Sequence, residues 1–229
     1  MSKSGKTVAV SLHHEVLIPW SRLRERLPAP PPVLSLDFHT DTLCAAARGV
    51  PLPVPADGRD PEKLENAVKS LHHDEHFDWA LRAGLISKAV IISVSPQTAP
   101  LACPGLRILP FRSAPPVQTI LNDPCAVRAF ADGLLSGGLP SSAELDFTRE
   151  ADPWILDVDC DVFLTARALE FPEDGLFADW VRRASLITVS RESDWVKLLR
   201  LPGEELTGEG LAARLLEKIR TTTRQGTIS

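Results

Sequence analysis

Short apolar runs alternate along this chain with helix-like segments, and this alternation constrains the fold more than any other feature. Strands that are apolar throughout, with helices between them, are typical of a parallel sheet covered on both faces. The sequence therefore predicts an α/β fold, a three-layer sandwich with a mostly parallel sheet. The expected strands are TVAVSL (7–12), VLSLDF (33–38), KAVIISV (88–94), LRILPF (106–111), WILDVD (154–159) and SLITVS (185–190). The expected helices cover residues 19–27, 61–71, 75–83, 123–135, 176–184 and 208–220.

Polar side chains gather where three of these strands end. They are His13, His14 and Glu15 after the first strand, Asp37, His39 and Asp41 at the second, and Asp157, Asp159 and Asp161 at the fifth. Side chains two apart on a strand point to the same face, and parallel sheets bind ligands at the carboxyl ends of their strands. Carboxylates brought together there repel one another unless a cation lies between them. The clusters therefore predict a site for one or two divalent metal ions.

The ligand types narrow the choice of metal. Aspartate oxygens dominate, imidazole nitrogens are a minority, and the four cysteines show no Cys-x-x-Cys spacing. Such a set suits Mn²⁺, Fe²⁺ or Zn²⁺ better than Ca²⁺ or Mg²⁺ alone. We expect Mn²⁺.

Length, composition and charge limit the number of domains, the class of partner and the expected location. The chain has 229 residues and 44% hydrophobic content, which is enough for one well-cored domain over residues 1–229. A net charge of -5, without a basic block, argues against nucleic acid or an anionic membrane as the main partner. No apolar stretch reaches the roughly 20 residues that span a bilayer. The start of the chain lacks the apolar core of a signal peptide, so we expect a cytoplasmic protein.

Five segments together resemble a known family. They are LHHEVLIPW (12–20), LDFHTD (36–41), FDWALRAGLIS (77–87), ILDVDCDVF (155–163) and LITVSRESD (186–194). In this order they resemble the peptide arginases, within the arginase/agmatinase-like ureohydrolase superfamily. The resemblance implies an arginase-like fold, a single ureohydrolase-like catalytic domain and two Mn²⁺ ions.

The resemblance also implies which residues bind the metals. One ion would be held by His13 and Asp41, the other by His39 and Asp159, with Asp37 and Asp157 bridging the two. Two alternatives stay open, because His14 could replace His13 and Asp161 could replace either Asp157 or Asp159.

Further residues are candidates for acting on the substrate. We expect His76 to donate a proton to the leaving amine, with His72 and His73 as alternatives in the same segment. Glu192 follows a predicted strand and would face the guanidinium cation. Asp78 is a further substrate-binding candidate, and Arg191 would bind a substrate carboxylate or pair with Glu192.

The expected reaction is hydrolysis of the guanidinium of arginine side chains in a ribosomal precursor peptide, giving ornithine and urea. The short chain leaves little loop material to enclose free arginine, which favours a peptide substrate. One alternative is an amidinohydrolase acting on free arginine, agmatine or a related small guanidino compound. Another is a noncatalytic metal-dependent binding module. The oligomeric state, including a homodimer, stays open.

Overall fold

A single parallel sheet organises the protein. The computed structural model describes residues 6–51, 60–95, 104–112, 114, 124–141, 145 and 152–225. Within these residues, six strands form a sheet in the order β1-β6-β5-β2-β3-β4, and each neighbouring pair is parallel. The strands are β1 (Thr7–Val10), β2 (Val33–Asp37), β3 (Ala89–Ser93), β4 (Leu106–Pro110), β5 (Ile155–Asp159) and β6 (Leu186–Ser190). All six predicted strands are confirmed.

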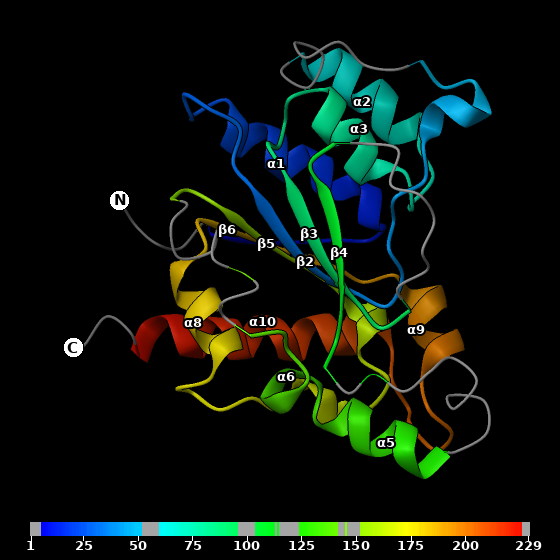
Figure 1. The fold of residues 1–229 in the computed structure, drawn as a ribbon, viewed down its shortest axis with the longest axis vertical. Coiled ribbons are helices and arrows are strands. Elements are labelled where there is room, and N and C mark those ends of the chain that lie inside the picture. The colour runs from blue at the N-terminus through cyan, green and yellow to red at the C-terminus, as the bar shows by residue number, and fades with distance from the viewer. Residues whose placement is uncertain are drawn as a thin grey trace.

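Helices cover both faces of the sheet, as the three-layer prediction requires (Figure 1). On one face lie α1 (Leu17–Arg24), α2 (Pro61–Ser70) and α3 (His76–Arg82). On the other lie α5 (Pro124–Asp132), α6 (Leu134–Gly137), α8 (Leu176–Arg183) and α10 (Gly208–Gln225). Each layer buries its own apolar cluster against the sheet, so the four central strands β2, β3, β5 and β6 are buried on both sides.

The helices differ from the sequence prediction in three places. Helix α9 (Ser193–Leu199) follows β6 and was not predicted. Helix α10 continues to Gln225, five residues past the predicted end at Arg220. The segment predicted as one helix over 123–135 is divided at Gly133 into α5 and α6, and Asp123 itself lies outside the described residues. In the described part of the chain, no helix is both long and apolar enough to cross a membrane.

Within the residues that the structure describes, four short 3₁₀ segments were also not predicted. They are η2 (His13–Val16), η3 (Ala45–Arg48), η6 (Cys160–Val162) and η7 (Ala166–Leu169). Segments of this length are too short to show a helical period in the sequence. Two of them carry polar side chains found after strands: η2 begins three residues after the end of β1 and carries His13 and His14, and η6 directly follows β5 and carries Asp161.

Strand alternation separates the two faces of β2. Leu34 and Leu36 pack into the cluster beneath α8 and α10, whereas Val33 packs into the cluster beneath α1 and α3. Ser35 and Asp37 share the face of Val33 because side chains alternate along a strand. The α1 and α3 face is therefore apolar at the start of the strand and polar at its carboxyl end.

Candidate metal centre

Four buried side chains from three segments meet at the carboxyl edge of the sheet. His13 Nδ1 lies 2.7 Å from Asp41 Oδ2, 3.0 Å from Asp159 Oδ2 and 3.6 Å from Asp37 Oδ2. One potential ligand atom from each residue lies within 4.8 Å of the others. Asp37 ends β2, Asp159 ends β5, and His13 begins η2, so the strand ends converge as the sequence predicts.

A second ligand group shares Asp37 with the first. It consists of Asp37, His39 and Asp161, with ligand atoms again within 4.8 Å of one another. His39 Nδ1 lies 2.9 Å from Asp161 Oδ2, and the backbone N–H of His39 donates to Asp37 Oδ1 at 2.8 Å. The other oxygen of Asp37, Oδ2, is buried and has no hydrogen-bond partner. Asp37 is thus placed to bridge two cations.

The local backbone brings Asp161 into this group. Asp159 caps the 3₁₀ turn η6 by accepting the backbone N–H of Asp161 at 3.2 Å. Asp161 Oδ1 in turn accepts the backbone N–H of Phe38 at 3.2 Å. The tight turn after β5 therefore directs Asp161 across to the end of β2.

The cluster carries excess negative charge. Burial and the neighbouring charge of Asp41 raise the pKa of Asp37 well above its usual range, and burial with Asp161 does the same for Asp159. Burial alone would lower the pKa of His13, but the charges of Asp157 and Asp159 raise it well above the ordinary value. A divalent cation would relieve this repulsion and bind the unpartnered oxygen of Asp37. The oxygen-rich set with one imidazole in each group fits Mn²⁺ and similar ions.

Backbone strain accompanies the cluster. Among the described residues, Asp41 and Glu192 are the non-glycine residues with positive φ, at 47° and 35°. Such conformations cost about 1–3 kcal/mol each and are concentrated at functional sites. Glu192 Oε1 accepts the backbone N–H of His13 at 2.5 Å, and burial raises the pKa of Glu192. The strained turn after β6 thus places the Glu192 carboxylate beside the first ligand group, as the sequence predicts.

A pocket of about 230 Å³ opens beside both groups. It shares His39 and Asp41 with them, and the Trp195 ring centroid lies 4.8 Å from that of His39 and 5.8 Å from that of His73. The complete lining is His39, Thr40, Asp41, Thr42, Leu43, His73, Asp74, Ser95 and Trp195. Among these described residues there is no lysine or arginine, and one carboxylate oxygen of Asp74 is buried without a hydrogen-bond partner.

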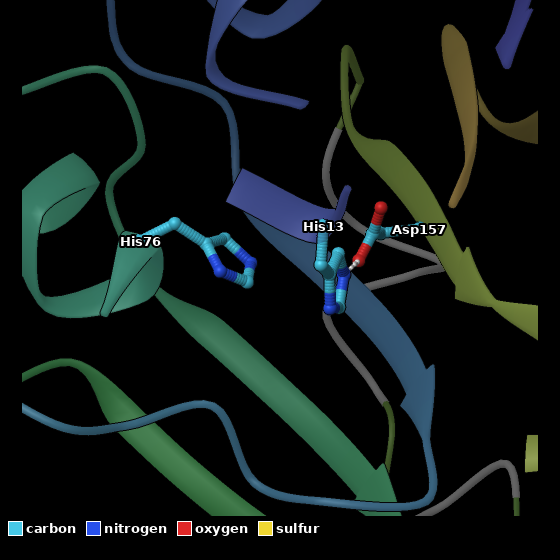
Figure 2. A group of neighbouring side chains, drawn as sticks. All are labelled: His13, His76 and Asp157. Carbon is cyan, nitrogen blue, oxygen red and sulfur yellow. Dashed lines mark hydrogen bonds and ion pairs between the residues drawn. The ribbon is translucent and has the colours of Figure 1, made fainter. Parts of the chain in front are cut away.

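His76 does not line this pocket. It is fully buried beside His13, with ring centroids 4.3 Å apart (Figure 2). It also packs against Phe77 and Trp20. Its Nδ1–H donates to the carbonyl of His73 at 2.8 Å. Burial and the charge of His13 hold the pKa of His76 well below its ordinary value. The expected proton donor therefore lies in the core as a neutral imidazole, whereas the alternative, His73, faces the pocket.

Other predicted residues lie apart from the ligand atoms. Both carboxylate oxygens of Asp78 accept from Arg82 Nε at 3.0 Å, so this expected substrate-binding residue is paired within helix α3. Arg191 donates to Ser11 Oγ at 3.2 Å and does not line the pocket. His14 is buried but belongs to neither ligand group, so the geometry favours His13 of the two adjacent histidines.

Asp157 lies on the far side of His13 from the other carboxylates. Its Oδ2 is 2.7 Å from His13 Nε2 (Figure 2), whereas the other ring nitrogen, Nδ1, faces Asp41 and Asp159. It belongs to neither group that contains Asp37. The structure therefore does not place Asp157 as a bridging residue, and it brings Asp161 to Asp37 instead.

Sequence reasoning overlooked Trp195 and Asp74 as pocket residues. Trp195 lies in α9, a helix too short to be recognised from periodicity, although it directly follows the LITVSRESD segment (186–194). Asp74 stands beside His73 in a histidine-rich segment, where a carboxylate next to a candidate imidazole was an available signal.

Comparison with known proteins agrees with this architecture. A hypothetical agmatinase from Burkholderia thailandensis superimposes with a TM-score of 0.53 at 15% sequence identity, over 97% of this chain and 60% of that chain. The chain has the arginase-like fold. Proclavaminate amidino hydrolase from Streptomyces clavuligerus gives a TM-score of 0.47 at 17% identity, over 95% of this chain and 61% of that one. The chain thus spans about three fifths of these two structures. Its sequence matches no protein-family model and no curated protein.

Proposed function

We propose that this protein is a binuclear manganese amidinohydrolase that acts as a peptide arginase. It converts arginine side chains in a ribosomal precursor peptide to ornithine and releases urea. The observation that carries the proposal is the pair of His/Asp ligand groups that share Asp37 beside a pocket at the carboxyl edge of an arginase-like fold.

The positions of the potential ligand atoms support an assignment of each metal-site residue. His13, Asp37, Asp41 and Asp159 form one cation position, and Asp37, His39 and Asp161 form the other. In this assignment Asp161 takes the place at the second position that the family resemblance gave to Asp159, Asp159 moves to the first position, and Asp157 is no longer a bridge. Two divalent cations bound there would lower the pKa of a water molecule and make hydroxide available near neutral pH.

The protein's own side chains bind and protonate the substrate. Glu192 lies beside His13 and outside the described pocket lining, and it would be the carboxylate partner of the guanidinium cation. Trp195, in the pocket wall, offers an aromatic face to the same cation. Water adds its oxygen to the guanidinium carbon as the bond from that carbon to Nε breaks. His73, at the pocket wall, gives a proton to Nε, which leaves as the amine of ornithine, while the carbon leaves as urea.

The pocket lining favours a substrate without a free α-carboxylate. Free arginine would bring a carboxylate next to Asp74, and the described lining offers no lysine or arginine to pair with it. Within a peptide that carboxylate is a neutral amide. Agmatine also lacks a carboxylate, so a small guanidino compound is the second candidate substrate.

Mass spectrometry tests the proposal directly. The chain is co-expressed with an arginine-containing candidate precursor peptide, and the peptide is expected to lose the mass of urea less that of water at each modified arginine. An Asp161→Asn variant is expected to leave the peptide unchanged. Urea released from free arginine or agmatine, with no change in peptides, would favour the small-molecule alternative. Bound metal without any hydrolysis would favour a noncatalytic binding module.

A further inference from the structure

We propose that Asp157 is a positioning residue that holds His13 from behind and thereby sets the affinity of one of the two cation positions. The inference rests on the proposed function, because it presumes that cations bind between the two ligand groups. Asp157 is fully buried and lies outside both groups that contain Asp37, although its ligand atom lies within 4.8 Å of those of His13 and His76.

The two ring nitrogens of His13 face different surroundings. Nδ1 faces Asp41, Asp159 and Asp37. Nε2 lies 2.7 Å from Asp157 Oδ2 (Figure 2). An ionised carboxylate only accepts hydrogen bonds, so Nε2 carries the proton and donates it to Asp157. When a cation displaces the proton from Nδ1, which faces Asp41 and Asp159, the lone pair of that nitrogen is directed at the cation position. The contact with Asp157 therefore selects the tautomer that can bind a metal.

Asp157 is itself held by donors from both neighbouring strands. Ser35 on β2 and Thr188 on β6 occupy the same register level as Asp157 on β5. Ser35 Oγ donates to Asp157 Oδ2 at 2.8 Å, and Thr188 Oγ1 donates to Oδ1 at 2.5 Å. Trp20 Nε1 donates in turn to Thr188 Oγ1 at 3.2 Å. A carboxylate anchored by the sheet on both sides fixes the orientation of the His13 ring.

The second cation position has no equivalent support in the described residues. Among the described residues, the side chain of His39 makes one hydrogen bond, from Nδ1 to Asp161, which is itself a residue of the second ligand group. The ring of His39 is partly exposed and packs against Trp195 and Phe38. His13 belongs to the first group and not to the second. Losing the Asp157 carboxylate should therefore weaken one cation position and spare the other.

The decisive variant is Asp157→Asn, which keeps the shape of the side chain and removes its charge. The matched control is Asp78→Asn, another buried aspartate that pairs with Arg82 and touches neither group. Mn²⁺ binding is measured by titration calorimetry, and the bound ions are examined by electron paramagnetic resonance. Removing an outer partner of a metal-binding histidine typically costs 10–100-fold in affinity, so we expect a loss of about that size at one position.

The electron paramagnetic resonance spectrum should differ between Asp157→Asn and the wild type. Wild-type protein and Asp78→Asn should show the spectrum of a coupled Mn²⁺ pair, whereas Asp157→Asn at limiting Mn²⁺ should show that of an isolated ion. If Asp157→Asn fails to fold, Thr188→Val removes one support of the same carboxylate and should weaken the same position to a smaller extent.

Two other outcomes distinguish failure of this inference from failure of the proposed function. Wild-type affinity at both positions in Asp157→Asn or in Thr188→Val, or equal weakening at both, would overturn this inference while leaving the proposed function intact. Wild-type protein that binds no Mn²⁺ would overturn the proposed function, and this inference with it.

Discussion

Replacing Asp37 with asparagine is expected to stabilise the metal-free protein and to abolish its stabilisation by Mn²⁺. Asparagine has the same shape, and its oxygen can still accept the backbone N–H of His39 that now donates to Asp37 Oδ1. Its amide nitrogen would occupy the place of Oδ2, which is buried without a partner, and would donate to the neighbouring carboxylates. One substitution thus relieves repulsion and removes the residue that both ligand groups share.

The size of the effect follows from the spacing of the charges. Asp37 shares its first group with two other carboxylates, Asp41 and Asp159, at separations of up to 4.8 Å. At an effective dielectric constant of about 20, each ionised pair at that distance costs about 3.5 kcal/mol. The metal-free protein avoids much of this cost by taking up protons, so we expect a net gain of roughly 2 kcal/mol. At about 2–4 °C per kcal/mol, Tm should rise by about 4–8 °C in chelator.

The gain should depend on pH in a defined direction. Burial and the charge of Asp41 raise the folded-state pKa of Asp37 above its unfolded value. The folded state therefore binds more protons, and wild-type stability falls as pH rises through the folded-state pKa. The advantage of Asp37→Asn should be small near pH ~4 and should grow toward pH ~8.

Thermal unfolding in chelator and in excess Mn²⁺ measures both effects. Mn²⁺ at about 100 times its Kd should add about 2.7 kcal/mol for each position in the wild type, or roughly 10–20 °C for two. Asp174→Asn, an exposed aspartate, makes the same charge change and should alter neither Tm. A lower Tm for Asp37→Asn in chelator at neutral pH, or a full Mn²⁺-dependent rise in that variant, would refute the reasoning.

Three further predictions concern the ions and the pocket. Mn²⁺ affinity should increase with pH, because binding displaces protons from Asp37 and His13, whose pKa values are raised. Calorimetry in buffers of different ionisation enthalpy should detect this release of protons. His73→Asn should lower kcat by about 10²–10⁴-fold without lowering Tm. His76→Asn should instead lower Tm, because it disturbs the core. The reverse pattern would support His76 as the proton donor. Trp195→Ala should raise KM for an arginine peptide by about 5–30-fold, whereas Trp195→Phe should retain most of the affinity, and equal KM values for the two would argue against an aromatic contact.

The sequence by itself determined the sheet and the location of its polar edge. Continuous apolar runs between helical segments leave few options other than a parallel sheet covered on both sides. Aspartate is depleted in strands, so Asp-x-His-x-Asp and Asp-x-Asp-x-Asp at strand ends stood out as candidate ligands. The resemblance to the peptide arginases then supplied His13, which local pattern alone could not separate from His14.

Only the tertiary structure decided where each aspartate lies relative to the histidines. Alternation along β5 places Asp157 and Asp159 on one face, but it does not say how far along β2 each lies. The register sets Asp157 level with Ser35, two residues before Asp37, so its carboxylate reaches the back of His13. The turn at η6 carries Asp161 forward to His39. The position of a residue relative to residues on neighbouring strands depends on how strands distant in the sequence pair, and that pairing is a property of the folded chain.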